Sequence, residues 1–155
     1  MEDTNVIIQQ ATKADLPAII ELMKALTLTT STAESGRTPQ PADFERIFEQ
    51  IAGDPNRRLF VAQVDGQIVA TADLLIAPNI SHRGLPWATL ENVVVAENMR
   101  QRGIGRKLLQ HIIDTARQSG CYKICLSSDK RRTEAHNLYQ SLGFDQYGLG
   151  FRIYF

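Results

Sequence analysis

Residues 93–105 read VVVAENMRQRGIG, and they connect an expected strand to an expected helix. Val93–Val95 is typical of a strand, and apolar side chains at helical spacing follow from about Gly105 to Ser119. The first turn of a helix has backbone N–H groups without intrahelical partners, and the helix dipole adds positive charge there. Because Gly103 and Gly105 let an anion approach these groups closely, the stretch predicts an anion site.

The charge distribution favours the same site. The whole chain carries 17 basic and 17 acidic side chains, a balance that disfavours a general nucleic-acid binder. Within residues 100–107, however, basic side chains occur without an acidic one, namely Arg100, Arg102, Arg106 and Lys107. A diphosphate is the natural ligand for such a turn. A structural alternative, a tight strand-to-helix turn with solvated arginines, stays open at this point.

Two other phosphate-binding motifs do not fit the turn. A P-loop requires Lys-Ser or Lys-Thr after its glycines, which this stretch lacks. A dinucleotide-binding G-x-G-x-x-G motif fails at its last position, where the chain has Leu108.

The rest of the chain predicts a mixed sheet with helices packed on it, in a single domain over residues 1–155. The expected helices are Leu16–Leu26, Phe44–Ile51, Gly105–Ser119 and Thr133–Leu142. The expected strands are Val6–Gln10, Leu59–Val64, Gln67–Leu75, Trp87–Val95, Tyr122–Ser127 and one or two within Phe144–Phe155. Asp65-Gly66 is a strong hairpin signal, and Thr12 with Asp15 indicates a capping pair. The element order is therefore β-α-α-β-β-β-α-β-α-β.

Composition excludes several classes of protein and of site. No uncharged apolar run approaches the ~18 residues that a membrane helix needs. Cys121 and Cys125 have a spacing unusual for zinc, and no histidines cluster beside them, so no metal is expected. Reduced cysteines in or next to a strand fit a cytoplasmic protein.

A second motif lies at residues 135–144, which read AHNLYQSLGF. Arg100-x-x-Gly103-x-Gly105 resembles the acetyl-CoA signature of the GNAT superfamily of N-acetyltransferases, and the second motif resembles that family's A-x-x-L/F-Y-x-x-x-G-F. The resemblance covers roughly residues 90–144. It implies a GNAT-type α+β fold with a central, mixed, mostly antiparallel sheet flanked by helices. It also implies acetyl-CoA as co-substrate and direct attack on the thioester by the primary amine of a small molecule, without a metal.

The resemblance assigns the coenzyme site residue by residue. It implies that the last strand before the motif faces the pantetheine arm, that its backbone N–H donates to the oxyanion, and that the turn holds the pyrophosphate. The residues so assigned are Val93, Val94, Val95, Arg100, Gln101, Arg102, Gly103, Ile104, Gly105 and Arg106.

Two catalytic side chains are expected. Tyr139 matches the family tyrosine that protonates the leaving sulfur, although it also fits core packing beside Leu138 and Leu142. Period-two alternation places Glu91 on the side of Val93 and Val95, where it is a candidate general base. A charge partner or a surface residue is an equal alternative for Glu91. Glu134 and His136 are weaker base candidates.

Other features concern the acceptor and the partners. Many relatives have an asparagine seven residues before the tyrosine, where this chain has Arg132. Lys130-Arg131-Arg132 is therefore expected either to reach an anionic group or to be solvated. Side chains from Leu26–Pro41, which contains the long loop Thr27–Pro41, and from Ile76–Pro86 are expected to shape the acceptor pocket. The family often forms homodimers, so a contact through the C-terminal strands is expected. The alternatives to a small-molecule enzyme are a non-catalytic acyl-CoA-binding regulatory domain and acetylation of a protein amine.

Overall fold

A five-stranded sheet runs through the molecule, with the strands in sequence order from one edge to the other. The computed structural model describes residues 5–27 and 38–153. The strands are β1 (Val6–Gln10), β2 (Arg57–Val64), β3 (Gln67–Ala77), β4 (Trp87–Val95) and β5 (Ile124–Cys125). β1 to β4 pair antiparallel, and the short β5 runs parallel to β4. The sheet is thus mixed and mostly antiparallel, as expected.

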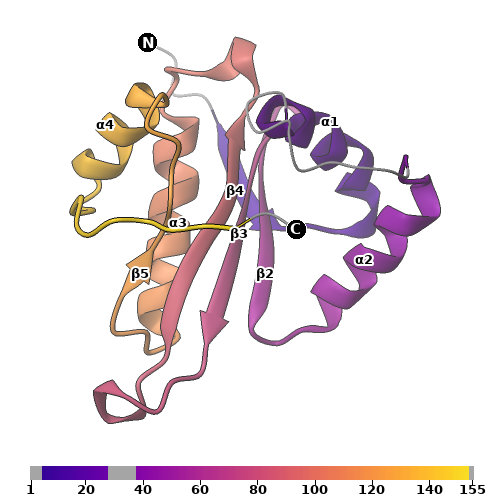
Figure 1. Ribbon diagram of the computed structural model, residues 1–155. Helices are drawn as coiled ribbons and strands as arrows, with labels where there is room; N and C mark the ends of the chain where they lie inside the picture. The colour runs from indigo at the N-terminus through magenta and orange to yellow at the C-terminus, as the bar shows by residue number, and fades with distance from the viewer. Residues whose placement is uncertain (1–4, 28–37, 154–155) are drawn as a thin grey trace.

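Helices cover both faces of this sheet (Figure 1). α1 (Leu16–Thr27) and α2 (Pro41–Gly53) lie on one face, and α3 (Ile104–Gln118) and α4 (Thr133–Ser141) lie on the other. The described residues also form three short 3₁₀ turns, namely η1 (Lys13–Asp15), η2 (His82–Gly84) and η3 (Glu97–Met99).

Each face of the sheet has its own apolar core. Leu16, Ile19 and Phe48 from α1 and α2 pack on Leu59 and Val61 of β2. On the opposite face α3 buries a helical stripe, made of Ile104, Leu108, Leu109, Ile112 and Ala116. Truncation of a buried leucine in this stripe to alanine is expected to cost about 2–5 kcal/mol of unfolding free energy. The rigid packing of α3 fixes the turn that precedes it.

The local turn signals of the sequence are confirmed. The Thr12 backbone N–H donates to Asp15 Oδ2 at 2.8 Å and caps η1, just before α1. Asp65 and Gly66 both have positive φ, and Val64 pairs with Gln67 across them. This is the geometry of a two-residue hairpin.

The C-terminal residues differ from expectation. No strand forms within residues 144–153, and residues 154–155 lie outside the described part. β5 spans only two residues instead of Tyr122–Ser127, so it offers almost no ladder to a following strand. Residues 144–153 instead cross in front of the sheet as an irregular segment, with Tyr147, Leu149, Phe151 and Ile153 exposed. The prediction of one or two final strands is therefore wrong for the described residues, and the homodimer contact stays a prediction.

Candidate active site

A cavity of about 580 Å³ lies where β4 ends and α3 begins. Every residue that the resemblance assigns to the coenzyme site lines this cavity except Arg102, which is exposed in the same turn. The lining from this region consists of Val93, Val94, Val95, Met99, Arg100, Gln101, Gly103, Ile104, Gly105 and Arg106. The opposite wall comes from α4 and the residues before it, including Ala135, Leu138 and Tyr139. We call this space the coenzyme cavity.

The two glycines of the turn have different roles. Gly103 is the N-cap residue of α3 with φ of 77°, and nothing lies within 4 Å of the place where a Cβ would be. A Cβ on Gly105 would instead lie 3.3 Å from Leu138 Cδ2 and 3.4 Å from Val95 Cγ2. Gly103 therefore permits the left-handed turn, and Gly105 permits the close approach of α3 to β4 and α4. The sequence alone instead favours one explanation for both glycines, namely the room that they leave for an anion.

Polar side chains tie this turn to its neighbours. Arg100 Nε donates to the Val95 carbonyl oxygen at 3.2 Å, and Arg106 Nη2 donates to Ser141 Oγ at 2.6 Å. The first-turn N–H groups of α3 and the nearby guanidinium groups together form a donor set suited to a diphosphate. The residues present therefore fit the phosphate end of a coenzyme.

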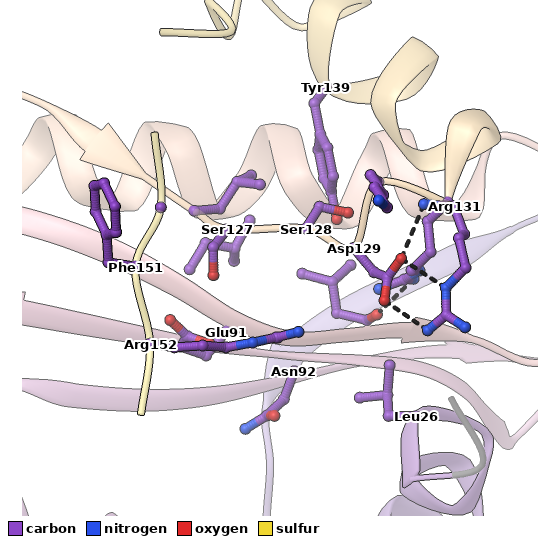
Figure 2. A pocket seen from close by; sticks show the side chains of 16 residues that line it. Leu26, Glu91, Asn92, Ser127, Ser128, Asp129, Arg131, Tyr139, Phe151 and Arg152 are labelled. Carbon is purple, nitrogen blue, oxygen red and sulfur yellow. Dashed lines mark hydrogen bonds and ion pairs between the residues drawn. The ribbon is translucent and has the colours of Figure 1, made fainter. Parts of the chain in front are cut away.

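A second cavity, of about 770 Å³, adjoins the first. Its side chains come from β4, from the loop between β5 and α4, and from the C-terminal segment (Figure 2). Leu26, Val93, Arg131, Arg132 and Tyr139 line both cavities, so the two spaces meet there. We call the second space the acceptor cavity.

A bulge in β4 changes the side that Glu91 faces. Thr71 pairs with Val94 and Asp73 pairs with Glu91, so two residues of β4 lie opposite one residue of β3. The bulge residue Asn92 has φ of 54°. Leu90, rather than Glu91, therefore shares the α3 side of the sheet with Val93 and Val95. The alternation that placed Glu91 beside these valines is wrong, because a bulge shifts side-chain alternation by one residue.

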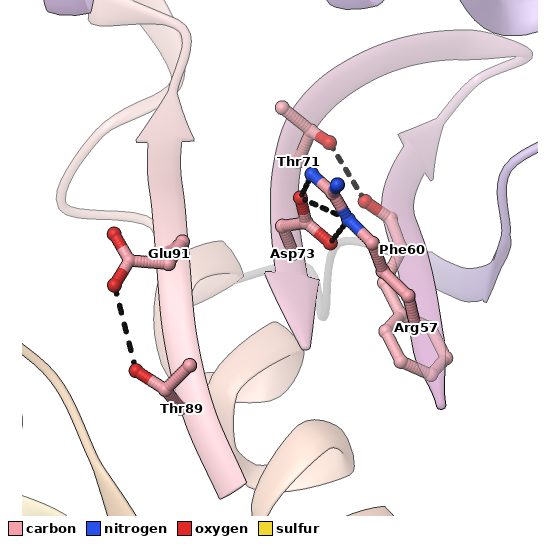
Figure 3. A network of polar contacts seen from close by, with 6 residues as sticks. All are labelled: Arg57, Phe60, Thr71, Asp73, Thr89 and Glu91. Atoms are coloured by element: carbon pink, nitrogen blue, oxygen red, sulfur yellow. Dashed lines mark hydrogen bonds and ion pairs between the residues drawn. The ribbon is translucent and has the colours of Figure 1, made fainter. Parts of the chain in front are cut away.

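Glu91 nevertheless reaches the acceptor cavity and is exposed there. Its Oε1 accepts a hydrogen bond of 3.4 Å from Thr89 Oγ1. Asp73, which pairs with Glu91 from the neighbouring strand β3, has a different environment. Its side chain is buried, and Arg57 Nε lies 3.1 Å from each of its carboxylate oxygens (Figure 3). This bond is the main cause that raises the pKa of Arg57. Of these two paired carboxylates, only Glu91 lines the acceptor cavity.

Tyr139 lies at the junction of the two cavities. Its ring is 6% exposed and packs edge-to-face on Phe144 at a centroid distance of 5.9 Å. Figure 2 shows the side chain pointing into the acceptor cavity, with its hydroxyl end beside Ser128. Burial raises the pKa of Tyr139, and the charge of Arg132 partly opposes this rise. The structure thus combines core packing of the ring with access for the hydroxyl.

The loop between β5 and α4 supplies polar groups that sequence reasoning left unassigned. Asp129 Oδ1 accepts hydrogen bonds of 2.9 Å from both the backbone N–H and Nε of Arg131, which hold the pKa of Asp129 well below its usual range. Arg132 Nη2 donates to the Val93 carbonyl oxygen at 3.4 Å. Ser128 Oγ is buried and has no hydrogen-bond partner among the described residues. Lys130, Arg131 and Arg132 all line the acceptor cavity.

The expected acceptor loops are largely not the ones that line the cavity. Of the stretch Leu26–Pro41, Leu26 lines both cavities and residues 28–37 lie outside the described part, whereas no residue of Ile76–Pro86 contributes to either cavity. Residues 126–132 and Gly150–Arg152 form the walls instead. Of the weaker base candidates, Glu134 lines the coenzyme cavity, whereas His136 lines neither cavity.

The sequence did contain a signal for the bulge in β4. The residue at the bulge is Asn92, and asparagine tolerates positive φ.

Within residues 5–27 and 38–153, no group of three or more His, Cys, Asp or Glu side chains is placed to hold a metal ion. Cys121 and Cys125 are both free thiols, and Cys125 belongs to β5. None of the helices described is long and apolar enough to cross a membrane.

Comparison with known proteins adds a family and several relatives. The model of the acetyltransferase (GNAT) family matches residues 21–144. A glucosamine 6-phosphate N-acetyltransferase of Trypanosoma brucei brucei is 33% identical over 87 residues, which span 56% of this chain and 57% of that protein. The [ribosomal protein bS18]-alanine N-acetyltransferase of Salmonella typhimurium is 36% identical over 74 residues, or 48% of this chain and 50% of the relative. The chain thus spans little more than half the length of these curated relatives.

Solved structures agree with this comparison over nearly the whole chain. A putative acetyltransferase from Agrobacterium tumefaciens superposes with a TM-score of 0.83 at 37% identity. The superposition covers 95% of this chain and 98% of that structure.

Proposed function

Because the chain belongs to the acetyltransferase (GNAT) family, we propose that it is an acetyl-CoA-dependent acyltransferase that acetylates the primary amine of a small molecule. The observation that carries this proposal is the junction of the two cavities at Val93 and Tyr139. A donor bound on one side and an acceptor bound on the other are brought together at that junction, and this proximity supplies much of the rate enhancement.

The coenzyme cavity supports binding of acetyl-CoA by its donors and its shape. The N–H groups of Gly103 to Arg106 and the guanidinium of Arg100 would hold the diphosphate, and the end of β4 would hold the pantetheine arm. Bound acetyl-CoA supplies an activated acetyl thioester at the junction. A backbone N–H within Val93–Val95 is the proposed donor to the carbonyl oxygen as it gains negative charge.

Two side chains that line the acceptor cavity have proposed roles in proton transfer. Glu91 is the proposed base, which removes a proton from the substrate ammonium directly or through a water molecule. Tyr139 is the proposed acid, because its raised pKa keeps the phenol protonated at neutral pH and its side chain points into the acceptor cavity.

The acceptor cavity supports a small amine that also carries an anionic group. Its volume of about 770 Å³ lies within the ~300–1,000 Å³ typical of small-molecule sites. Residues Gly150–Arg152 form part of its wall, which supports a compact acceptor rather than an extended protein surface. Four cationic side chains line it against two carboxylates, namely Lys130, Arg131, Arg132 and Arg152 against Glu91 and Asp129.

The test is a panel of amines assayed for thiol release from acetyl-CoA. The panel pairs each amine with its phosphorylated or carboxylated counterpart, for example glucosamine with glucosamine 6-phosphate, and includes a peptide with an N-terminal alanine. We expect release with a small amine, and a higher kcat/KM for the anionic member of the pair. Tight coenzyme binding in calorimetry without release from any amine would contradict the proposal and favour a non-catalytic coenzyme-binding domain. Release with the peptide alone would favour a protein acceptor.

A further inference from the structure

Arg132 occupies an unusual position among the cations of the site. It precedes α4 and is partly buried, and it lines both cavities, as Tyr139 does. Its Nη2 donates to the Val93 carbonyl oxygen at 3.4 Å. Among the described residues, no carboxylate forms an ion pair with Arg132, whereas its neighbour Arg131 is paired with Asp129.

A guanidinium group stays charged at every physiological pH, and its withdrawal from water is costly unless a negative charge or hydrogen-bond acceptors compensate. A single hydrogen bond of 3.4 Å satisfies little of its donor capacity. Arg132 therefore has donor capacity left for an anionic group at the junction of the two cavities, which it lines.

We propose that Arg132 is a positioning residue that acts through Tyr139, by offsetting the negative charge that forms on the tyrosine oxygen during acetyl transfer. This proposal rests on the function proposed above. The amine nitrogen forms a bond to the acetyl carbon as the carbon–sulfur bond breaks, and the sulfur keeps the electron pair. Glu91 first takes one proton from the ammonium and releases it to solvent. The phenolic proton of Tyr139 passes to the sulfur, and the second proton lost by the nitrogen passes to Glu91. The phenolate then regains a proton from solvent, to which Glu91 releases its own.

The surroundings of Tyr139 explain why an added cation matters. Burial raises the pKa of this phenol, which makes it a weaker acid, and the charge of Arg132 acts in the opposite direction. The other charged side chains that line the two cavities around Tyr139 are Glu91, Arg100, Arg106, Asp129, Lys130, Arg131, Glu134 and Arg152. Among these charged side chains of the described residues, Arg132 is the one whose charge lowers the pKa of Tyr139.

The first test is a spectroscopic titration of tyrosinate in the coenzyme-free protein, which does not depend on activity. The same titration of Tyr139→Phe isolates the signal of this one tyrosine. We expect Arg132→Gln to raise the pKa of Tyr139 and Arg132→Lys to leave it near the wild-type value. The Arg132 side chain makes no capping hydrogen bond to α4, so both variants should keep the helix, as circular dichroism would show.

The second test is kinetic, with the best amine of the panel. We expect Arg132→Gln to lower kcat about 10-fold. In the pH profile of kcat, the decline at high pH should move to higher pH, and the KM for acetyl-CoA should change less than about threefold. Arg132→Lys should retain most of kcat. Arg117→Gln is the matched control, because Arg117 is paired with Asp114 at the far end of α3 and should alter neither the titration nor kcat.

Two results would overturn the inference. The first is an identical titration of Tyr139 in the wild type and Arg132→Gln. The second is a raised KM for acetyl-CoA with unchanged kcat, which would make Arg132 a ligand of the coenzyme. If the wild type acetylates no amine, the proposed function fails, but the titration still decides whether Arg132 and Tyr139 are coupled.

Discussion

The coenzyme cavity and the acceptor cavity are built in different ways. The floor of the coenzyme cavity comes from one stretch of the chain, from Val93 to Arg106, and many of the binding groups proposed for it are backbone N–H groups. The acceptor cavity takes its side chains from α1, β4, the loop before α4 and the C-terminal segment, which lie far apart in the sequence. A main-chain site needs only a short local pattern, whereas a side-chain site depends on how distant segments pack.

This contrast extends to two acidic residues that pair across neighbouring strands, Asp73 of β3 and Glu91 of β4. Asp73 is 1% exposed and held by Arg57, so it belongs to the scaffold, whereas Glu91 is exposed in the acceptor cavity (Figure 3). One side chain therefore contributes to stability and the other is available for chemistry.

The largest expected effect tests the scaffold half of this contrast. Arg57→Met leaves the Asp73 carboxylate buried without its partner, and we expect the free energy of unfolding to fall by about 3–5 kcal/mol. Chemical denaturation measures this loss, and Arg117→Met, at an exposed pair, should cost at most about 0.5 kcal/mol. The double variant Arg57→Met/Asp73→Leu should recover much of the stability. If it does not, the charge of Asp73 is not the cause.

The next effect concerns the junction of the two cavities. Tyr139→Phe keeps the ring that packs on Phe144 but removes the acidic proton, so we expect kcat to fall about 100-fold with unchanged stability. Coenzyme affinity by calorimetry should also be unchanged. Because the phenol acts while protonated and burial raises its pKa, the loss of wild-type kcat from this group should come at a higher pH than an ordinary tyrosine would give. An active Tyr139→Phe would show that the side chain only packs.

A smaller effect tests whether backbone conformation shapes the coenzyme cavity. Gly103 has φ of 77° and open space around its missing Cβ, so Gly103→Ala introduces strain of about 1–2 kcal/mol without a clash. We expect coenzyme affinity to fall about 5- to 10-fold, measured by calorimetry. Gly103→Asn should bind more tightly than Gly103→Ala, because asparagine tolerates this conformation. Equal affinities for both variants would contradict this explanation.

These differences explain what the sequence could predict. The turn at Arg100–Gly105 and the motif around Tyr139 were predictable, since each depends on residues a few positions apart. The side that Glu91 faces was not, because a one-residue bulge at Asn92 reverses the alternation on which the prediction rested.

For the C-terminal segment the sequence predicted strands that do not form within residues 144–153. Alternating apolar residues from Tyr147 to Ile153 predict a strand, but a strand needs a neighbouring edge, and β5 is two residues long. The segment instead brings Phe151 and Arg152 to the acceptor cavity, about 60 residues along the chain from Glu91. No local pattern encodes such a contact.

The smallest effect tests whether the two cavities function independently. Asp129→Asn removes the charge partner of Arg131 in the acceptor loop, and we expect the KM for the amine to rise by at most about threefold, because exposed ion pairs are weak. The bonds from Arg131 lower the pKa of Asp129 in the folded protein. The pair therefore contributes to folding stability above the unfolded pKa near 3.8, and this contribution is lost only as the pH falls through the lower folded value. The wild-type KM should therefore show no change from this group between pH 7 and 5.

Arg131 lines both cavities, so a parallel loss of coenzyme affinity in Asp129→Asn would mean that the loop couples donor and acceptor binding. An unchanged affinity would place Asp129 with the acceptor alone.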